Sequence, residues 1–271
     1  MPAIAFYLDA PLQSWGASSK FQYRETGAFP SKSAVVGLVA AALGIDKHAP
    51  DEAERLAPVA GLRFTAVKLP KAHPARAKKL LDVNRLTDFH TIGGGYTPKD
   101  SRDTTSWEAM MCNHKASGGI KKSKGSPGTV ITRRSYLTDA AFAAILEGSD
   151  EPLLTRIRDA LLNPVWGVWF GRKTCLPATP LTPTLASDRE AALQTLLTAL
   201  PGREPVPLNG FEYQEECATA SPGDGSYSQS DQPIAFGQHH GPVPAPYRAR
   251  TIRPQRPSSV HEPKSGDETT N

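Results

Sequence analysis

The residues between Pro11 and Arg24 combine hydrogen-bonding groups, cations and aromatic rings in one short stretch. They are Gln13, Ser14, Trp15, Lys20, Phe21, Tyr23 and Arg24. Single-stranded RNA is bound by this combination, because each base that stacks on a ring gains about 1–3 kcal/mol and phosphates pair with the cations. Packing of Trp15 and Phe21 in the core is an equally good interpretation of these two rings. The stretch therefore predicts a loop that either binds RNA or is anchored by its aromatic residues.

A second candidate site is the start of the helix expected at residues 33–43. The apolar run SAVVGLVAAAL is typical of a buried helix, with Ser31 or Ser33 as the N-cap and Gly44 as the stop. Lys32 in the first turn is unfavourable beside the positive end of the helix dipole, unless an anion binds there. We therefore expect Lys32, Ser31 and Ser33 to hold a phosphate. The alternative is that Lys32 points into water.

Residues for catalysis are few. The sequence contains no Gly-x-Ser-x-Gly, Ser-x-x-Lys, His-Glu-x-x-His or P-loop pattern, and its three cysteines lie too far apart for a Cys-x-x-Cys metal site. Metal-independent RNA cleavage needs only a few dispersed acid and base groups, which His90, Tyr96 and Lys115 or Lys121 could supply. A structural or RNA-contacting role for His90 is the alternative. We predict no catalytic residue, no metal and no cofactor.

Charge is distributed unevenly along a chain whose net charge is only +4. No acidic residue occurs between Glu108 and Asp139 or between Asp231 and Glu262, and both spans carry clustered cations. These are Lys115, Lys121, Lys122, Lys124, Arg133 and Arg134 in the first span, and Arg248, Arg250, Arg253 and Arg256 in the second. Because clustered lysine and arginine neutralise phosphates, we expect local contacts with a polyanion. Solvated loops kept soluble by their cations are the alternative.

Strand and helix patterns alternate around these residues. Apolar runs predict strands at residues 3–8, 62–69, 80–92, 129–146 and 165–170, and helical spacing predicts helices at 33–43, 51–57, 152–162 and 188–200. The order βαββαβ is the ferredoxin-like plan. Gly37 costs the first helix up to about 1 kcal/mol relative to alanine, so another element is expected to approach it closely.

The domain boundaries follow from composition. Residues 93–128 are rich in glycine, serine, threonine and lysine and too long for an ordinary connection, which predicts a projecting insertion. The main domain is expected at residues 1–200, followed by a strand-containing extension at 201–253 and a disordered tail at 254–271. No apolar run approaches the roughly 20 residues that span a bilayer, so no membrane contact is expected.

Five sequence blocks occur in the same order as in a known family. They are PLQSWG at 11–16, TGAFPSKSAVVGLVAAALGI at 26–45, DFHTIGGG at 88–95, RRSYLTDAAF at 133–142 and FGRKTCLPATPL at 170–181. Together they resemble the CasD family of type I-E CRISPR Cascade subunits, within the RAMP superfamily. The resemblance covers roughly residues 3–181, and its first two blocks are specific in combination.

The resemblance implies an α+β fold, a ferredoxin-like or RRM-like domain with a protruding β-hairpin thumb and a small C-terminal extension. Such a subunit is expected to be cytoplasmic, to bind the 5′ handle of a CRISPR guide RNA, and to contact the backbone and large subunits of the complex. Target DNA would be met only indirectly. The subunit would be non-catalytic; the alternative is the metal-independent endoribonuclease that type I-C relatives use to process repeat RNA.

The resemblance also implies which individual residues contact RNA. Those expected to bind the guide RNA are Gln13, Ser14, Trp15, Arg24, Lys32, Ser33, His90, Thr91, Lys121, Lys122, Lys124, Arg133, Arg134, Arg172 and Lys173. His90 and Thr91 would lie at the base of the thumb, and the lysine cluster at 121–124 within it. The basic pairs at 133–134 and 172–173 could instead meet acids of neighbouring subunits.

Overall fold

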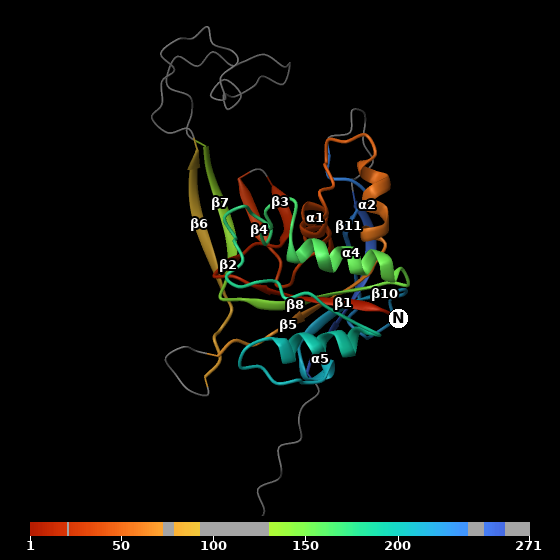
Figure 1. The fold of residues 1–271 in the computed structure, drawn as a ribbon. Helices are drawn as coiled ribbons and strands as arrows, with labels where there is room; N and C mark the ends of the chain where they lie inside the picture. Colours follow the sequence, from red (N-terminus) through yellow and green to blue (C-terminus); the bar gives the residue numbers. More distant parts are fainter. Residues whose placement is uncertain (21, 73–78, 93–129, 238–246, 258–271) are drawn as a thin grey trace, which may run out of the picture.

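Two β-sheets meet in the computed structural model, which describes residues 1–20, 22–72, 79–92, 130–237 and 247–257 (Figure 1). The larger sheet has the strand order β11-β12-β10-β5-β8-β1-β9. The smaller sheet has the order β2-β7-β4-β3, with β6 paired to β7. Within the described residues, no helix is both long enough and apolar enough to cross a membrane.

The centre of the larger sheet consists of β1 (Ala3–Asp9), β5 (Arg63–Lys68), β8 (Ala141–Glu147) and β9 (Thr184–Ala186). These strands have the order β5-β8-β1-β9, and each pairs antiparallel with its neighbour. All seven residues of β1 are buried, because both faces of the sheet are covered. Alternation along β1 sends Ile4 and Phe6 into one core and Ala5 and Tyr7 into the other.

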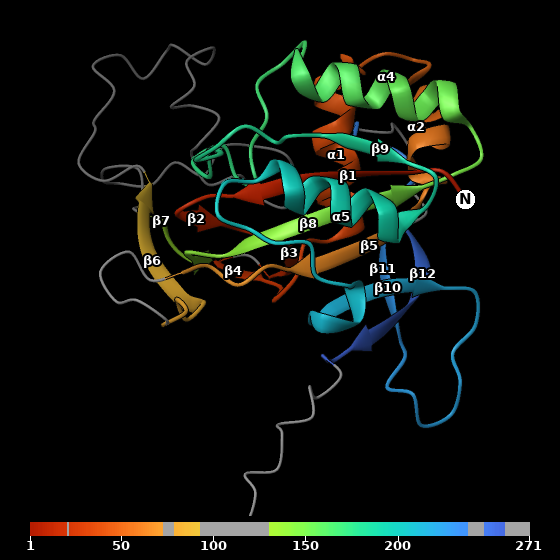
Figure 2. The same ribbon diagram turned by 60° about the horizontal axis from the view of Figure 1, so that its bottom comes forward.

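Helices cover both faces of this sheet (Figures 1 and 2). On one face lie α1 (Lys32–Leu43), α2 (Glu52–Ala60) and α4 (Glu151–Leu162), whose apolar residues form the larger core. On the other face, α5 (Arg189–Ala199) packs on the smaller core. The predicted caps of α1 are confirmed: Ser31 Oγ accepts a hydrogen bond from the Ala34 amide, and Gly44 has a φ of 69°.

The C-terminal strands extend the larger sheet beyond β5. β10 (Tyr213–Cys217) pairs with β5 on one side and with β12 (Tyr247–Gln255) on the other. β11 (Tyr227–Pro233) forms the edge and packs beside α1 (Figure 1). Strands far apart in the chain are thereby brought to the N-terminal end of α1.

The smaller sheet joins β2 (Leu12–Gln13), β3 (Gly16–Lys20), β4 (Tyr23–Thr26), β6 (Asn84–Ile92) and β7 (Val130–Thr138). β6 and β7 pair along their whole length and project from the body (Figure 1). The predicted insertion at 93–128 follows β6 in the sequence and lies outside the described residues.

Two predicted strands are wrong. The single strand expected at 129–146 is two strands, because the chain turns at Asp139, whose φ is 55°, between β7 and β8. The strand expected at 165–170 does not form. Instead, the Val165 and Trp166 amides donate to carbonyls in the last turn of α1, at 3.0 and 3.3 Å, so this aromatic segment covers the end of a helix.

Candidate nucleic-acid interface

Three of the polar and aromatic side chains predicted to bind RNA are buried. Gln13 Nε2 donates to the carbonyls of Leu8 (3.1 Å) and Ala140 (2.7 Å), and Gln13 Oε1 accepts from Trp15 Nε1 at 3.0 Å. Trp15 is 1% exposed, and its ring centroid lies 5.9 Å from that of Phe170. The buried Ser14 hydroxyl faces the Ser135 carbonyl at 3.5 Å. Prediction of RNA contacts through the side chains of Gln13 and Trp15 is therefore wrong, because these two side chains anchor the loop. Ser14, although buried, is part of the wall of the cleft described below.

The phosphate site predicted at the start of α1 is also wrong, because the protein supplies its own anion. Lys32 is 1% exposed, and its Nζ donates to Glu216 Oε2 at 2.8 Å. The Lys32 amide donates to Asp231 Oδ2 at 2.8 Å, and Asp231 also pairs with the buried Arg250. Burial lowers the pKa of Lys32, while the hydrogen bond and charge of Glu216 oppose that shift.

A cleft of about 680 Å³ opens between β4, the N-terminal end of α1 and the β11–β12 pair. We call it the arginine cleft. Its lining includes Arg24, Glu25, Ser31, Ser33, Arg172 and Tyr247. Two arginines and a single exposed carboxylate, that of Glu25, give its open wall a net positive charge. Such a wall attracts a polyanion.

Arg172 is held rigidly at the cleft. Its guanidinium donates to the carbonyls of Ser135 (2.9 Å) and Arg24 (3.0 Å) and lies over the Tyr136 ring, 4.5 Å from the centroid. A guanidinium carries five N–H groups, so three remain after these two hydrogen bonds. A fixed fork of donors is suited to a phosphate, because little side-chain entropy is lost on binding.

One face of the smaller sheet carries further cations. Arg134 on β7 is in register with Arg24 on β4 and with Asp88 on β6, so the three side chains share a face. His90 lies two residues beyond Asp88, with its Nδ1 3.7 Å from Asp88 Oδ2. Arginines in directly opposed positions are unfavourable unless an anion lies between them. This face therefore extends the positive surface of the arginine cleft along β7.

Arg133 points to the opposite face of the same sheet. Its guanidinium lies 5.1 Å from the Tyr23 ring centroid and 5.2 Å from that of Phe89, and it donates to the Tyr23 hydroxyl. Tyr23 is 50% and Phe89 62% exposed. Arg133 and Arg134, which the sequence suggests as one basic pair, thus serve different surfaces.

The other predicted residues are distributed as follows. Ser33 lines the arginine cleft, and Lys173 Nζ lies 5.5 Å from the Trp169 ring centroid. Thr91 is in β6, next to His90. Lys121, Lys122 and Lys124 lie outside the described residues, as do Phe21, Tyr96 and Lys115. In the described part of the chain, no group of three or more His, Cys, Asp or Glu side chains could hold a metal ion.

A family model described as CRISPR-associated protein (Cas_Cas5) matches residues 3–240. The chain belongs to this family. CasD, a subunit of the CRISPR Cascade system of Escherichia coli (strain K12), is 28% identical to this Cas5 protein over 220 residues, which are 78% of this chain and 80% of CasD.

Two solved structures resemble this chain. A chain of a CRISPR RNA-guided surveillance complex superposes with a TM-score of 0.61 and 27% identity, covering 93% of this Cas5 protein and 88% of that chain. A crystal structure of a Cas protein superposes with a TM-score of 0.51 and 24% identity, covering 93% of each chain, and shows a similar fold.

Several residues at the cleft of this Cas5 protein escaped the sequence analysis. Phe236 and Tyr247 line it from the segments that follow β11 and begin β12, and Asp231 closes its floor. The acid-free span that starts at Asp231 marks this region, but its arginines suggested RNA rather than an internal partner. Arg250 in fact neutralises Asp231 inside the protein.

Proposed function

We propose that this Cas5 protein is the subunit of a type I-E CRISPR surveillance complex that binds the 5′ handle of the guide RNA. Backbone and large subunits of the same complex are its protein partners, and it acts in the cytoplasm. The relationship to CasD and the similarity to a chain of an RNA-guided surveillance complex support this assignment. The observation that carries the RNA-binding role is the arginine cleft, with Arg24 and Arg172 in its wall.

The proposed architecture is a ferredoxin-like domain at residues 1–200 with a thumb based on β6 and β7. The strand order β5-β8-β1-β9 supports it, because a split βαββαβ unit orders its strands 2-3-1-4. In this proposal Arg24, Arg134 and Arg172 contact phosphates, and Ser33 and His90 donate hydrogen bonds to RNA. Thr91 and the lysines at 121–124 continue the contact into the thumb, and residues 201–253 close the cleft as an extension.

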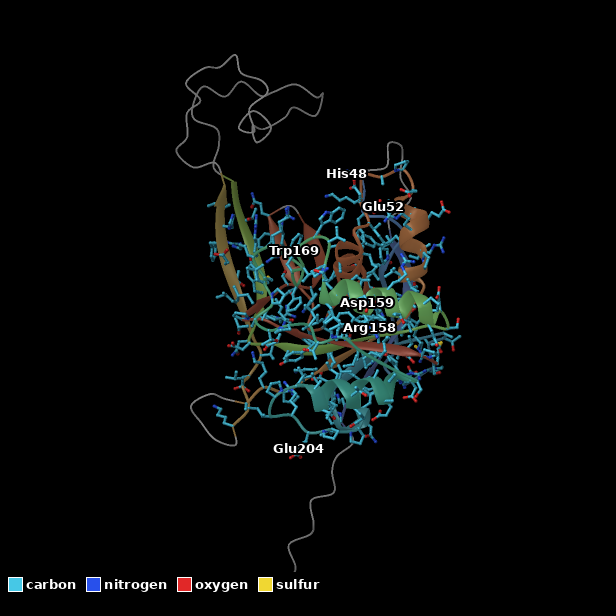
Figure 3. All side chains as sticks on the ribbon, viewed as in Figure 1. His48, Glu52, Arg158, Asp159, Trp169 and Glu204 are labelled. Atoms are coloured by element: carbon cyan, nitrogen blue, oxygen red, sulfur yellow. The ribbon has the colours of Figure 1, made fainter. Side chains whose placement is uncertain are left out.

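The test is binding of the full chain to RNA of its own CRISPR repeat handle, measured by fluorescence anisotropy over a range of salt concentrations. Arg24→Ala and Arg134→Ala should each weaken binding and reduce the salt slope by about 0.7, since each removes one single-strand phosphate contact. Arg158→Ala is the matched control, because Arg158 lies on α4 and pairs with Asp159 there (Figure 3).

Two outcomes would overturn the proposal. One is wild-type protein that binds handle RNA no better than an unrelated RNA of the same length. The other is co-expression with the remaining Cascade subunits that yields a complex without this chain. Equal loss of affinity in Arg158→Ala and Arg24→Ala would remove the cleft from the binding site.

We also propose that the subunit binds RNA without cutting it. The runner-up is a metal-independent endoribonuclease, for which the favouring observation is His90, 48% exposed in its side chain and 3.7 Å from Asp88. A histidine beside a carboxylate can act as a general base.

A further inference from the structure

A second hollow, of about 210 Å³, continues the arginine cleft along α1. Ser33, Ala34, Gly171 and Phe236 line both hollows, so the two spaces are adjacent. The character of the surface changes along this path. Arginines and hydroxyls line the first space, whereas the second is bounded by the rings of Trp169 and Phe236 and by Leu38 and Ala41 of α1.

Phe236 lies over Gly37 of α1. A Cβ atom at Gly37 would lie 3.4 Å from Phe236 Cζ, so the ring rests directly on the helix backbone. The segment of Phe236 is held from the other side by Glu52, whose buried carboxylate accepts hydrogen bonds from the amides of Phe236 (2.6 Å) and Gly237 (3.0 Å). The close approach predicted at Gly37 is therefore made by a fixed aromatic side chain.

Trp169 forms the other aromatic boundary. In the view of Figure 3 it appears between the β6–β7 pair and α2. Lys173 Nζ is 5.5 Å from the centre of its indole ring, so a cation lies next to this ring. The space thus combines aromatic boundaries with positive charge next to Trp169 and in the adjoining cleft.

These features specify the occupant. Pockets for drug-sized ligands measure about 300–1,000 Å³. The hollow, at about 210 Å³, is smaller and admits one planar ring system. Its lining offers two aromatic rings, and among the side chains that line it only those of Ser33 and Trp169 carry hydrogen-bonding groups. The cations beside it suit an anion covalently attached to that ring system, and a nucleotide within a single strand has this composition.

We propose that the hollow between Trp169 and Phe236 receives one base of the RNA whose backbone lies in the arginine cleft. This inference rests on the proposed function and deepens it. Because every base can stack on an aromatic ring, the site binds any of the four bases, and only an abasic position lowers the affinity. The site therefore fixes the register of the strand rather than reading its sequence.

The experiment uses handle RNAs in which each position in turn is abasic, with the affinity of the full chain measured by fluorescence anisotropy. For wild-type protein, one position should respond with a loss of about 5- to 150-fold, the range for one stacked base. Any of the four bases at that position should restore binding. Trp169→Ala and Phe236→Ala should bind intact RNA as weakly as wild type binds that abasic RNA, with little further loss on removal of the base.

Trp166→Ala is the matched control, because Trp166 is 43% exposed, lies in the same segment and does not line the hollow. Phe236→Leu and Trp169→Phe keep the fold if truncation harms it, and thermal unfolding of every variant verifies this. Trp169→Phe should retain most of the affinity.

If Trp169→Ala and the abasic position each lowered RNA affinity by the same factor whether or not the other change was present, the base site would be overturned. The proposed function would stand as long as wild type binds intact RNA. Unchanged RNA affinity together with loss of a Cascade subunit on co-purification would assign the hollow to a protein partner instead. Wild-type protein that binds none of the RNAs would overturn the proposed function itself.

Discussion

The Asp231 carboxylate accepts a hydrogen bond from the Lys32 amide at 2.8 Å, although the two residues are 199 positions apart in the chain. The same carboxylate receives two hydrogen bonds from Arg250, and all three residues are buried. A carboxylate at the N-terminal end of a helix is favoured by the dipole and by the free amides there. Asp231 therefore joins the β11–β12 pair to α1.

Asp231→Ala should destabilise the protein strongly, because it leaves the Arg250 guanidinium buried without its partner. Removing one member of a buried pair costs about 3–5 kcal/mol. Urea unfolding followed by circular dichroism would measure it. Asp224→Ala is the control, since Asp224, in the turn that precedes β11, pairs with Arg253 of β12 at 2.9 Å near the surface. Comparable losses in both variants would refute the special role of Asp231.

Substitutions of Lys32 should act on stability rather than directly on RNA. Lys32→Glu places a carboxylate against Glu216 and Asp231, so the variant should lose most of its stability. Lys32→Met combined with Glu216→Gln should be close to the wild type, because a buried ion pair can often be replaced by neutral groups without loss. A stable Lys32→Glu variant with weakened RNA binding would instead restore the phosphate site at this position.

Gly171→Ala should be more damaging than an ordinary glycine substitution. Gly171 has a φ of 94°, and a Cβ there would lie 1.7 Å from the Ser14 carbonyl oxygen. Gly202→Ala is the control, with a φ of 68° and no atom within 4 Å. The left-handed conformation alone costs about 1–2 kcal/mol. We expect that loss for Gly202→Ala and a clearly larger one for Gly171→Ala, measured as midpoints of urea unfolding.

Glu147→Gln should stabilise the protein at pH 7. Burial raises the pKa of the Glu147 carboxyl above its usual 4.5, and Oε2 has no hydrogen-bond partner in the described structure. Below pH 4.5 the folded and unfolded chains both hold this proton. Between pH 4.5 and the raised pKa, the unfolded chain releases this proton while the folded chain keeps it, so the free energy of unfolding falls as pH rises. Above the raised pKa the carboxylate is charged in both states, and the full loss of stability remains.

The gain in Glu147→Gln should therefore disappear as pH falls below about 4.5, the usual value of the carboxyl. Urea unfolding of both proteins at several pH values would measure this difference in stability. Glu204→Gln, at the exposed Glu204 beyond α5, removes the same charge without altering a buried site (Figure 3). A Glu147→Gln protein less stable than wild type at pH 7 would show that attraction to the charges of Arg63 and Arg189 outweighs the cost of burying the carboxylate.

His90→Ala tests the endoribonuclease alternative. If the subunit only binds RNA, wild-type protein in EDTA should leave its own CRISPR repeat RNA uncut, and His90→Ala should change affinity alone. Denaturing gel electrophoresis of labelled repeat RNA would detect cleavage. A defined cut at the handle boundary that is lost in His90→Ala would favour the enzyme.

Elements with a strong local pattern could be predicted from the sequence. β1, α1 and α5 were found within about one residue, because apolar periodicity and caps are properties of neighbouring residues. The turn at Asp139 was missed because a single non-glycine residue with positive φ gives no periodic signal. The segment at 165–170 has the composition of a strand, but its amides bind carbonyls at the C-terminal end of α1 instead of a neighbouring strand.

The site was harder to predict than the fold. Trp15 and Lys32 have the side chains that RNA-binding loops use, and only their distant neighbours determine that they are buried. Glu216 and Asp231, which neutralise the start of α1, come from strands whose pairing the sequence does not specify. Arg24 was singled out, by contrast, from the polar and aromatic stretch that ends at it, and Arg172 from the block at 170–181. The structure brings the two together at one cleft.

The contact between Lys32 and Asp231 also has a consequence for synthesis of the protein. At about 5–20 residues per second, a ribosome needs roughly 10–40 s to add the 199 residues that separate them. During that interval the start of α1 lacks its carboxylate, and the Lys32 amine lacks Glu216. The nascent chain can complete this end of the helix only after β11 has left the ribosome, so β11 and β12 complete the fold last.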